Sequence, residues 1–137
     1  MFLSFPQFLP NLQMWYNLPM GITKVNLKIS NPKNPKKFFE GEFLVDSGAS
    51  FTVVPTTELN KLGIKPQGEE KFVLADGKII KRKVGSAMYT YKDIERAAPV
   101  LFGLKGDSLL LGVFTLEALG LSLDPLQREL YKATLRV

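Results

Sequence analysis

Alternating apolar and polar residues predict that the chain after residue 21 begins with two strands. Residues 22–29 alternate without interruption, which is typical of a strand with one buried face. The segment 31–37 is rich in Pro, Asn and Lys and predicts a turn. Residues 37–43 predict the returning strand, so the two strands form a hairpin that leads the chain into the apolar pair Leu44-Val45.

The stretch 42–55 has two apolar halves, rich in β-branched residues, that are separated by the polar turn Asp46-Ser47-Gly48-Ala49. Each half predicts a buried strand. A carboxylate between two such strands needs hydrogen bonds or a partner, because a lone buried charge is strongly unfavourable. Gly48 has no Cβ and lets the main chain approach another group closely. Asp-Ser-Gly is also a common turn sequence, but its apolar flanks favour a functional role for Asp46.

The rest of the pattern predicts further short strands and two short helices. A helix over 56–64 ends at Gly63, and a second helix ends at Gly120. A hairpin over 72–80 turns at Asp76-Gly77, where Asp76 is more readily explained as a turn residue than as a catalytic acid. The remaining predictions are a loop over 66–70, strands over 87–91, 97–102, 108–111 and 129–137, and a common buried face for Tyr131, Ala133, Leu135 and Val137.

The amino-acid composition limits which catalytic mechanisms are possible. The chain has 137 residues, of which 45% are hydrophobic, so it is long enough for one domain with a real core. It contains no cysteine and no histidine. Disulfides, thiolate zinc sites and Ser-His-Asp or Cys-His catalysis are therefore excluded. A hydrolase made of these residues must use carboxylates, lysine or an oxygen-ligated metal.

The net charge of +5 is concentrated in lysine clusters within 31–37 and 78–83. Such clusters could attract nucleic acid. No RNA- or DNA-binding motif accompanies them, so we favour solvated turns and strand faces.

Residues 1–20 predict an apolar N-terminal extension, and 21–137 predict the single domain. The extension has no Lys or Arg, and Pro6, Pro10 and Pro19 interrupt it, so neither a secretory signal nor a membrane span is expected. Three interpretations stay open: a disordered extension, an apolar arm that docks on the body or a partner, or a start site assigned too far upstream. Together with the absence of cysteine, this predicts a cytoplasmic protein.

Two stretches follow one plan of strand, glycine and short helix. Residues 44–48 lead to Leu62-Gly63-Ile64, and residues 109–112 lead to Leu119-Gly120-Leu121. If Gly48 and Gly112 are equivalent, Leu110 occupies the place of Asp46. The second copy then lacks the carboxylate. Hydrolysis of an amide by carboxylates needs two of them, one as base and one as acid.

The ordered set of these motifs closely resembles the retroviral-type aspartic proteases, or retropepsins, and their cellular and prokaryotic relatives. The resemblance covers residues 25–123, including the Asp46 turn, the hairpin at Leu74-Ala75-Asp76-Gly77 and the run 109–112 before a helix. It implies an all-β, closed acid-protease barrel with short helices after the active-site turn and near the C-terminus. It implies no metal and no cofactor.

The resemblance also implies a role for each residue of the turn. Asp46 would activate water together with Asp46 of a second copy. Two carboxylates so close cannot both be ionised, so the pair would share one proton, as is established for aspartic proteases. Ser47 would brace the two turns across the dimer axis. Gly48 would present its main chain to the substrate, and Ala49 completes the turn.

The hairpin over 72–84 would act as a flap, with Ala75, Asp76 and Gly77 at or near its tip and against the substrate. The C-terminal strand over 129–137 would contribute to the dimer sheet. The leading hypothesis is thus a homodimeric aspartic endopeptidase that acts on peptide or protein substrates. The alternatives are a catalytically weak peptide-binding or assembly module on the same fold and a basic nucleic-acid-binding domain.

Overall fold

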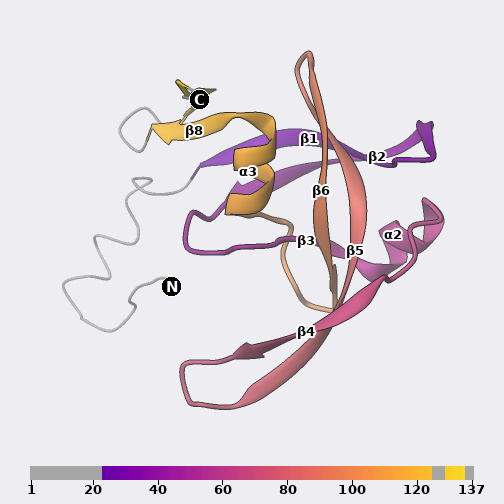
Figure 1. The fold of residues 1–137 in the computed structure, drawn as a ribbon, viewed down its shortest axis with the longest axis vertical. Coiled ribbons are helices and arrows are strands. Elements are labelled where there is room, and N and C mark those ends of the chain that lie inside the picture. The colour runs from indigo at the N-terminus through magenta and orange to yellow at the C-terminus, as the bar shows by residue number, and fades with distance from the viewer. Residues whose placement is uncertain (1–22, 125–128, 135–137) are drawn as a thin grey trace.

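The computed structural model describes residues 23–124 and 129–134. The predicted extension over residues 1–20 lies outside this part of the chain, as do the last residues of the predicted strand 129–137. The described residues form strands with two short helices (Figure 1). In chain order, the elements are β1 (Lys24–Asn31), β2 (Asn34–Val45), β3 (Thr52–Pro55), α2 (Thr56–Lys61), β4 (Gly68–Val73), β5 (Ile79–Tyr91), β6 (Ile94–Gly103), β7 (Leu110–Leu111), α3 (Val113–Leu119), β8 (Leu121–Asp124) and β9 (Glu129–Lys132).

Seven of the strands form one curled sheet in the order β1-β2-β7-β3-β6-β5-β4. β1 also pairs with β5 over three residue pairs, so the sheet bends back on itself. The all-β prediction is confirmed, but the predicted closed barrel is not, because the sheet does not close into a regular barrel. The ladder is weakest at β7, which meets β3 through the single pair Val53↔Leu110. The chain leaves the sheet at the end of β2, next to β7, and there forms the turn that carries Asp46.

The core lies inside the curl of the sheet. Its largest fully buried side chains include Tyr89, Phe43, Leu27, Ile29 and Leu111. β1 and β2 pair in antiparallel register from Lys24↔Leu44 onward, which confirms the predicted first hairpin. Because strand residues alternate between the two faces, this register buries Leu27, Ile29 and Phe43 on the concave side.

Both predicted helices are present, and glycine ends each of them. Gly63 follows α2 with φ of 74°, and Gly120 caps α3 with φ of 69°. This left-handed conformation is disfavoured for residues with a Cβ, so glycine stops the helix at these points. The helices pack Leu59, Leu116 and Leu119 into the core.

The β4–β5 hairpin projects from the body as an arm (Figure 1). Its turn has Gly77 at φ of 85°, and Oδ1 of Asp76 accepts a hydrogen bond from the Lys78 amide at 2.9 Å. The predicted hairpin is confirmed, and Asp76 acts as a turn residue. The predicted loop over 66–70 is confirmed for residues 66 and 67 and wrong for 68–70, because β4 begins at Gly68, where the long β5 offers a strand edge for pairing.

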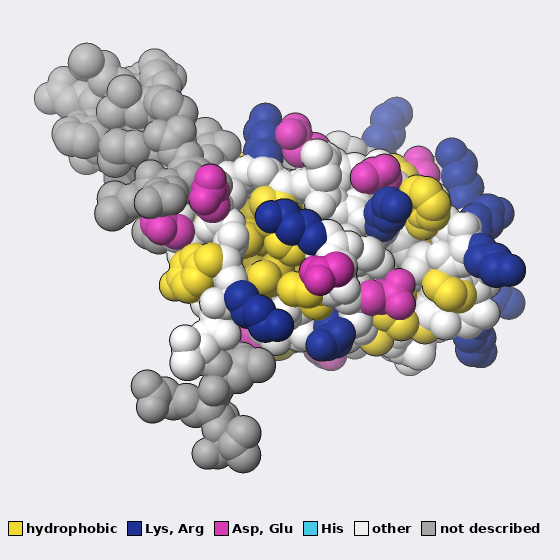
Figure 2. Space-filling model, turned by 90° about the horizontal axis from the view of Figure 1, so that it is seen from above, with side chains coloured by type: hydrophobic (Ala, Val, Ile, Leu, Met, Phe, Trp, Pro, Cys, Tyr) yellow, Lys and Arg dark blue, Asp and Glu magenta, His cyan; other side chains and the backbone are white. Residues whose placement is uncertain are grey.

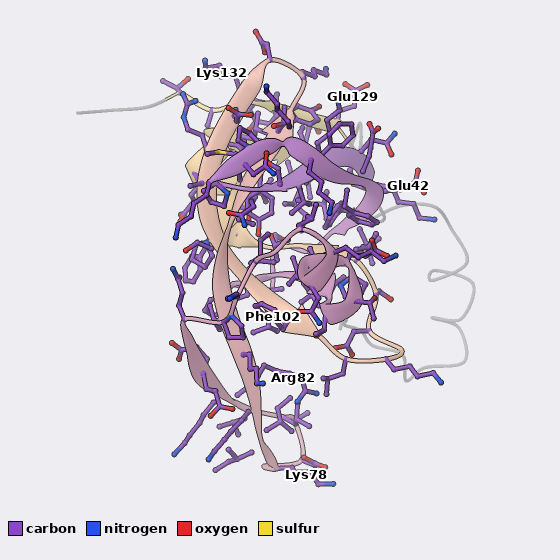
Figure 3. The ribbon with its side chains drawn as sticks, turned by 90° about the vertical axis from the view of Figure 1, so that its right-hand side faces the viewer. Glu42, Lys78, Arg82, Phe102, Glu129 and Lys132 are labelled. Atoms are coloured by element: carbon purple, nitrogen blue, oxygen red, sulfur yellow. The ribbon has the colours of Figure 1, made fainter. Side chains whose placement is uncertain are left out.

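β8 and β9 form a separate two-stranded sheet with Leu123 opposite Leu130. This register turns Leu130 into the core, with 8% of its surface exposed, whereas Tyr131 is 53% exposed. The predicted buried face through Tyr131 is therefore wrong by one residue, and Leu135 and Val137 lie outside the described residues. Figure 3 shows Glu129 and Lys132 at the opposite end of the molecule from Lys78 in the β4–β5 turn.

Candidate active site

Asp46 begins a tight turn directly after β2. Its amide donates to the Leu111 carbonyl at 3.0 Å, and its own carbonyl accepts from the Ala49 amide at 3.1 Å. The Gly48 amide donates to Oδ1 of Asp46 at 2.9 Å. The half-buried carboxylate is therefore held by the main chain of its own turn. Within the described part of the chain, Oδ2 accepts no hydrogen bond, so it is free to bind another group.

The other residues of the turn lie beside this carboxylate. A Cβ on Gly48 would come within 3.3 Å of Oδ1 of Asp46, which is tighter than ordinary contact. The Ser47 side chain is exposed, and its hydroxyl has no partner among residues 23–124 and 129–134. The structure thus brings together Asp46, Ser47, Gly48 and Ala49 as one turn, as the sequence predicts.

Gly112 lies level with Asp46 on the neighbouring strand. The parallel register pairs Leu44 with Leu110 and Val45 with Leu111. Continued by one residue, this register places Gly112 beside Asp46; it does not test whether Gly48 and Gly112 correspond in the repeat, which stays a prediction. Neither Gly112 nor Leu110 carries a carboxyl group, so the second copy of the motif still supplies no acid.

Gly112 is also tightly enclosed by the turn. A Cβ built on it would lie 2.5 Å from the carbonyl carbon and oxygen of Phe51 and 2.7 Å from the carbonyl oxygen of Ser50. These are main-chain atoms and cannot rotate away as a side chain could. Only glycine fits where the Asp46 turn crosses the start of α3.

The first amides of α3 hold the far end of the turn. Val113 donates to the Ala49 carbonyl at 2.8 Å, and Phe114 donates to the Ser50 carbonyl at 3.0 Å. The first amides of a helix have no partner within the helix, and α3 has no side-chain cap. The turn that carries Asp46 therefore supplies the carbonyls that α3 needs, and each element fixes the other.

A cluster of buried hydroxyl groups lies behind the turn. Oγ1 of Thr52 lies 2.6 Å from Oγ1 of Thr115 and accepts from the Gly112 amide at 3.0 Å. The Tyr89 hydroxyl donates to the Pro99 carbonyl at 2.9 Å. Burial raises the pKa of Tyr89 well above its ordinary value, although hydrogen bonds with Thr115 and Thr52 oppose that rise.

Sequence reasoning did not identify these hydroxyl residues as part of the site. One signal was present, because Thr52 and Thr115 are polar residues within otherwise apolar segments. Buried hydroxyls need hydrogen-bond partners, so a threonine in a buried strand implies a polar contact elsewhere in the fold. The sequence alone does not reveal which residue supplies it.

The β4–β5 hairpin contacts the Asp46 turn through aromatic side chains. The Phe72 ring meets the Phe51 ring edge-on, with centroids 5.8 Å apart, and Phe51 meets Phe114 in the same way at 5.2 Å. In Figure 1, the hairpin tip and the connection from β2 to β3 point to the same side of the molecule. The hairpin is thus anchored beside the turn through Phe72, near the end of β4 that leads into the hairpin tip, by residues that sequence reasoning missed.

The tip of the hairpin makes no polar contact with the Asp46 turn among the described residues. Ala75, Asp76 and Gly77 are exposed. Across the described residues, no hydrogen bond or ion pair joins them to Asp46, Ser47 or Gly48. The structure therefore supports these three residues as a hairpin tip, and their contact with a substrate stays a prediction.

Charged side chains of both signs lie on the arm. Glu69 lies opposite Lys83 and Glu70 lies opposite Arg82, whereas Lys71 lies opposite Lys81. On the face shown in Figure 2, basic and acidic side chains are likewise interspersed around exposed hydrophobic ones. Such mixing weakens a single-sign field and favours the interpretation of the lysine clusters as solvated surface.

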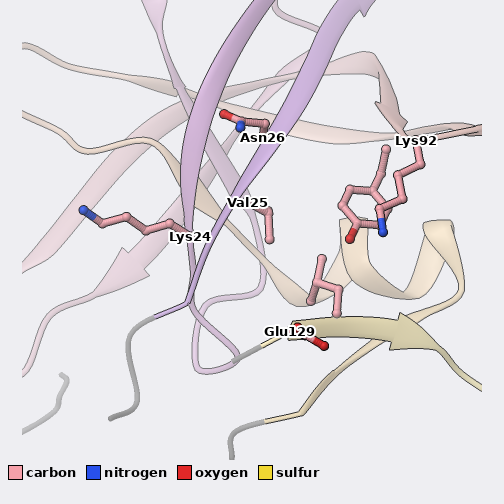
Figure 4. Close-up of a pocket in the computed structure, with 7 residues that line it drawn as sticks. Lys24, Val25, Asn26, Lys92 and Glu129 are labelled. Carbon is pink, nitrogen blue, oxygen red and sulfur yellow. The ribbon is translucent and has the colours of Figure 1, made fainter. Parts of the chain in front are cut away.

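One hollow of about 470 Å³ lies away from the turn, between β1, the β5–β6 turn and β9 (Figure 4). Val25, Tyr91 and Leu130 line it together with charged side chains, and none of its lining residues belongs to the Asp46 turn or the hairpin. Over the described ranges, no group of three or more Asp and Glu side chains is placed to hold a metal ion. No helix among these residues is long and apolar enough to cross a membrane.

The curled all-β sheet, the Asp46 turn locked against Gly112 and the hairpin beside it together define an acid-protease type of domain. The sequence model of the aspartyl protease family matches residues 34–113, which is more than half of the chain. The chain belongs to this retropepsin-like aspartyl protease family. The match runs from the start of β2 through the Asp46 turn and the hairpin to the first residue of α3. A search of curated proteins found no match to the chain.

Proposed function

We propose that the protein is an aspartic endopeptidase that is active as a homodimer, with Asp46 of each protomer as the catalytic carboxylate. The observation that carries the proposal is the Asp46 turn. It holds one carboxylate oxygen through the Gly48 amide and leaves the other unpaired within the described residues, in a chain of the aspartyl protease family. A group held in this way is ready to bind water or a second carboxyl group.

The need for a second protomer follows from the position beside Asp46. Gly112 occupies it and has no side chain. Carboxylate-catalysed hydrolysis requires one group to accept a proton from water and another, protonated, to polarise the carbonyl. Two copies related by a two-fold axis would supply Asp46 twice, and the pair would share one proton. The Ser47 side chain is exposed and in this proposal would contact its symmetry mate.

The terminal sheet is the surface that we assign to dimer contact. β9 leaves Tyr131 more than half exposed while Leu130 packs into the core. A large aromatic side chain on an exposed strand is typical of residues that are buried on association. Since Figure 3 places this sheet at the opposite end from the hairpin tip, dimer contact there leaves the hairpin free to cover a substrate.

The substrate of this proposal is an extended peptide held beneath the hairpin. Phe51, Phe72 and Phe114 form an aromatic surface next to the turn, and Phe114 is 41% exposed. Such a surface suits an apolar side chain of the peptide, while strand-like main-chain bonds give further affinity. Ala75, Asp76 and Gly77 would close over the peptide from the tip.

The decisive test replaces Asp46 by Asn, with Asp93→Asn as the matched control. Asparagine keeps the shape of the side chain but cannot act as acid or base. We expect Asp46→Asn to lower the hydrolysis of a mixed peptide library between about pH 3 and 8 by at least about 100-fold, the lower end of what acid–base catalysis contributes. Asp93→Asn removes an exposed carboxylate from the turn between β5 and β6 and should keep most of the activity.

Sedimentation and specific activity, both measured as functions of protein concentration, test the dimer. Activity should fall on dilution together with the dimer fraction, and Asp46→Asn should sediment as the wild-type protein does. Full activity in Asp46→Asn, or in a verified monomer, would exclude the proposed mechanism. Binding of library peptides without any Asp46-dependent cut would instead support the peptide-binding module, and tight, salt-sensitive binding of RNA or DNA would support the nucleic-acid alternative.

A further inference from the structure

The buried hydroxyl groups behind the Asp46 turn come from three separate elements. Thr52 lies on β3, Thr115 lies in α3 and Tyr89 lies on β5. All three are fully buried. Thr52 and Thr115 are 63 residues apart in the sequence, yet their oxygens are 2.6 Å apart. A contact this close between distant elements means that the fold brings these hydroxyls together.

The donors and acceptors connect the three hydroxyls to two main-chain groups. Oγ1 of Thr52 accepts from the Gly112 amide, and the Tyr89 hydroxyl donates to the Pro99 carbonyl. Each hydroxyl has one proton to donate, so the Tyr89 oxygen acts as the acceptor in its hydrogen bonds with Thr115 and Thr52, and either threonine can donate to the other. Hydrogen bonds linked in this way polarise and strengthen one another.

The cluster connects to Asp46 through one peptide group. The carbonyl of Leu111 accepts from the Asp46 amide at 3.0 Å. The amide of the same peptide unit, which belongs to Gly112, donates to Thr52 at 3.0 Å. A rotation of this peptide plane that broke one bond would also disturb the other, because the peptide group is planar. The orientation of the plane at Gly112 thus sets the start of the catalytic turn.

We propose that Thr52, Thr115 and Tyr89 form a hydroxyl relay that fixes the Leu111–Gly112 peptide and thereby positions the Asp46 carboxylate. The three are positioning residues, since none of them has to touch the substrate. The inference rests on the proposed peptidase function and deepens it. It identifies the part of the fold that keeps the two carboxylates of a dimer in register.

Water cannot readily replace the relay. The main chain of Phe51 and Ser50 encloses Gly112, and both threonine side chains have no exposed surface. An amide that loses its partner in such a place stays unsatisfied, and the surrounding chain moves to relieve it. Movement of about 1 Å at a catalytic group can lower the rate about 100-fold.

The test uses Thr52→Val, which keeps the shape of the side chain and removes its hydroxyl. We expect kcat to fall about 10- to 100-fold while KM changes by less than about threefold, because the defect lies in placement of the carboxylate. Thr52→Ser restores the hydroxyl and should recover most of kcat. Thr56→Val is the matched control, since it removes a threonine hydroxyl that bonds the Gly103 carbonyl at 2.8 Å, outside the relay.

A second measurement keeps the test independent of turnover. Amide hydrogen exchange, followed by NMR, should become at least tenfold faster at Asp46 and Gly112 in Thr52→Val, and should stay unchanged there in Thr56→Val. Unchanged exchange in Thr52→Val, or a loss of kcat that Thr56→Val reproduces, overturns the relay. An inactive wild-type protein whose exchange follows the expected pattern overturns the peptidase proposal and leaves the positioning of Asp46 by the relay supported.

Discussion

Replacing Gly112 by Ala tests the contact between the Asp46 turn and the start of α3. The added methyl group would lie 2.5 Å from two main-chain atoms of Phe51 and 2.7 Å from the carbonyl oxygen of Ser50. Favourable separations between carbon atoms are about 3.5–4.0 Å, so the atoms must part by about 1 Å. The bonds from Val113 to Ala49 and from Phe114 to Ser50 resist that movement.

The expected cost combines overpacking with loss of main-chain bonds. Overpacking in a dense core costs about 1–3 kcal/mol, and each buried amide left without a partner costs about 1–3 kcal/mol more. We therefore expect Gly112→Ala to lower the free energy of unfolding by at least about 3 kcal/mol. Proteolytic activity should fall with it, because the turn that moves is the turn that carries Asp46.

Urea unfolding measures this loss at a fixed protein concentration, which matters because association stabilises a folded chain. Gly68→Ala is the control, since a Cβ at Gly68 would meet no atom within 4 Å. It should change the free energy of unfolding by less than about 1 kcal/mol. If the free energy of unfolding of Gly112→Ala lies within about 1 kcal/mol of the wild-type value, the main chain around Gly112 moves easily, and the claim that only glycine fits there is refuted.

Two further predictions concern Tyr89 and the hairpin. Burial raises the pKa of Tyr89, so the folded state holds this proton more tightly than the unfolded chain does. The contribution of Tyr89 to the free energy of unfolding should be constant below about pH 10 and then fall by about 1.4 kcal/mol per pH unit. Tyr89→Phe should remove this alkaline loss in pH-dependent urea unfolding, whereas Tyr131→Phe, at an exposed position, should keep it. Phe72→Ala removes an edge-on aromatic contact that contributes about 0.5–1.5 kcal/mol, so KM for apolar peptides should rise about 3- to 10-fold. Val73→Ala is the control, because the Val73 side chain is 72% exposed. Equal KM values for Phe72→Ala and Val73→Ala would argue against an aromatic contact that holds the hairpin.

Local sequence patterns predicted the pieces of this fold well. The turn at Asp46, the hairpin turn at Gly77 and the helix ends at Gly63 and Gly120 depend on residues close together in the chain. Their physical basis is steric freedom at glycine and short side-chain to main-chain bonds. Because neither depends on the rest of the molecule, the sequence was a sufficient guide to them.

The errors share a different cause. The sequence placed Tyr131 toward the core, whereas pairing of Leu123 with Leu130 reverses the faces of β9. A shift of one residue in strand register exchanges the two faces, and register between β8 and β9 is set by packing.

What the sequence determined by itself is the catalytic candidate, Asp46 in a glycine turn between buried strands, and the all-β nature of the chain that carries it. Only the tertiary structure decided that Gly112 lies level with Asp46 and that Thr52, Thr115 and Tyr89 meet behind it. Steric and turn preferences act within a few residues, whereas these contacts form only when distant strands have taken one register and expelled water from between them.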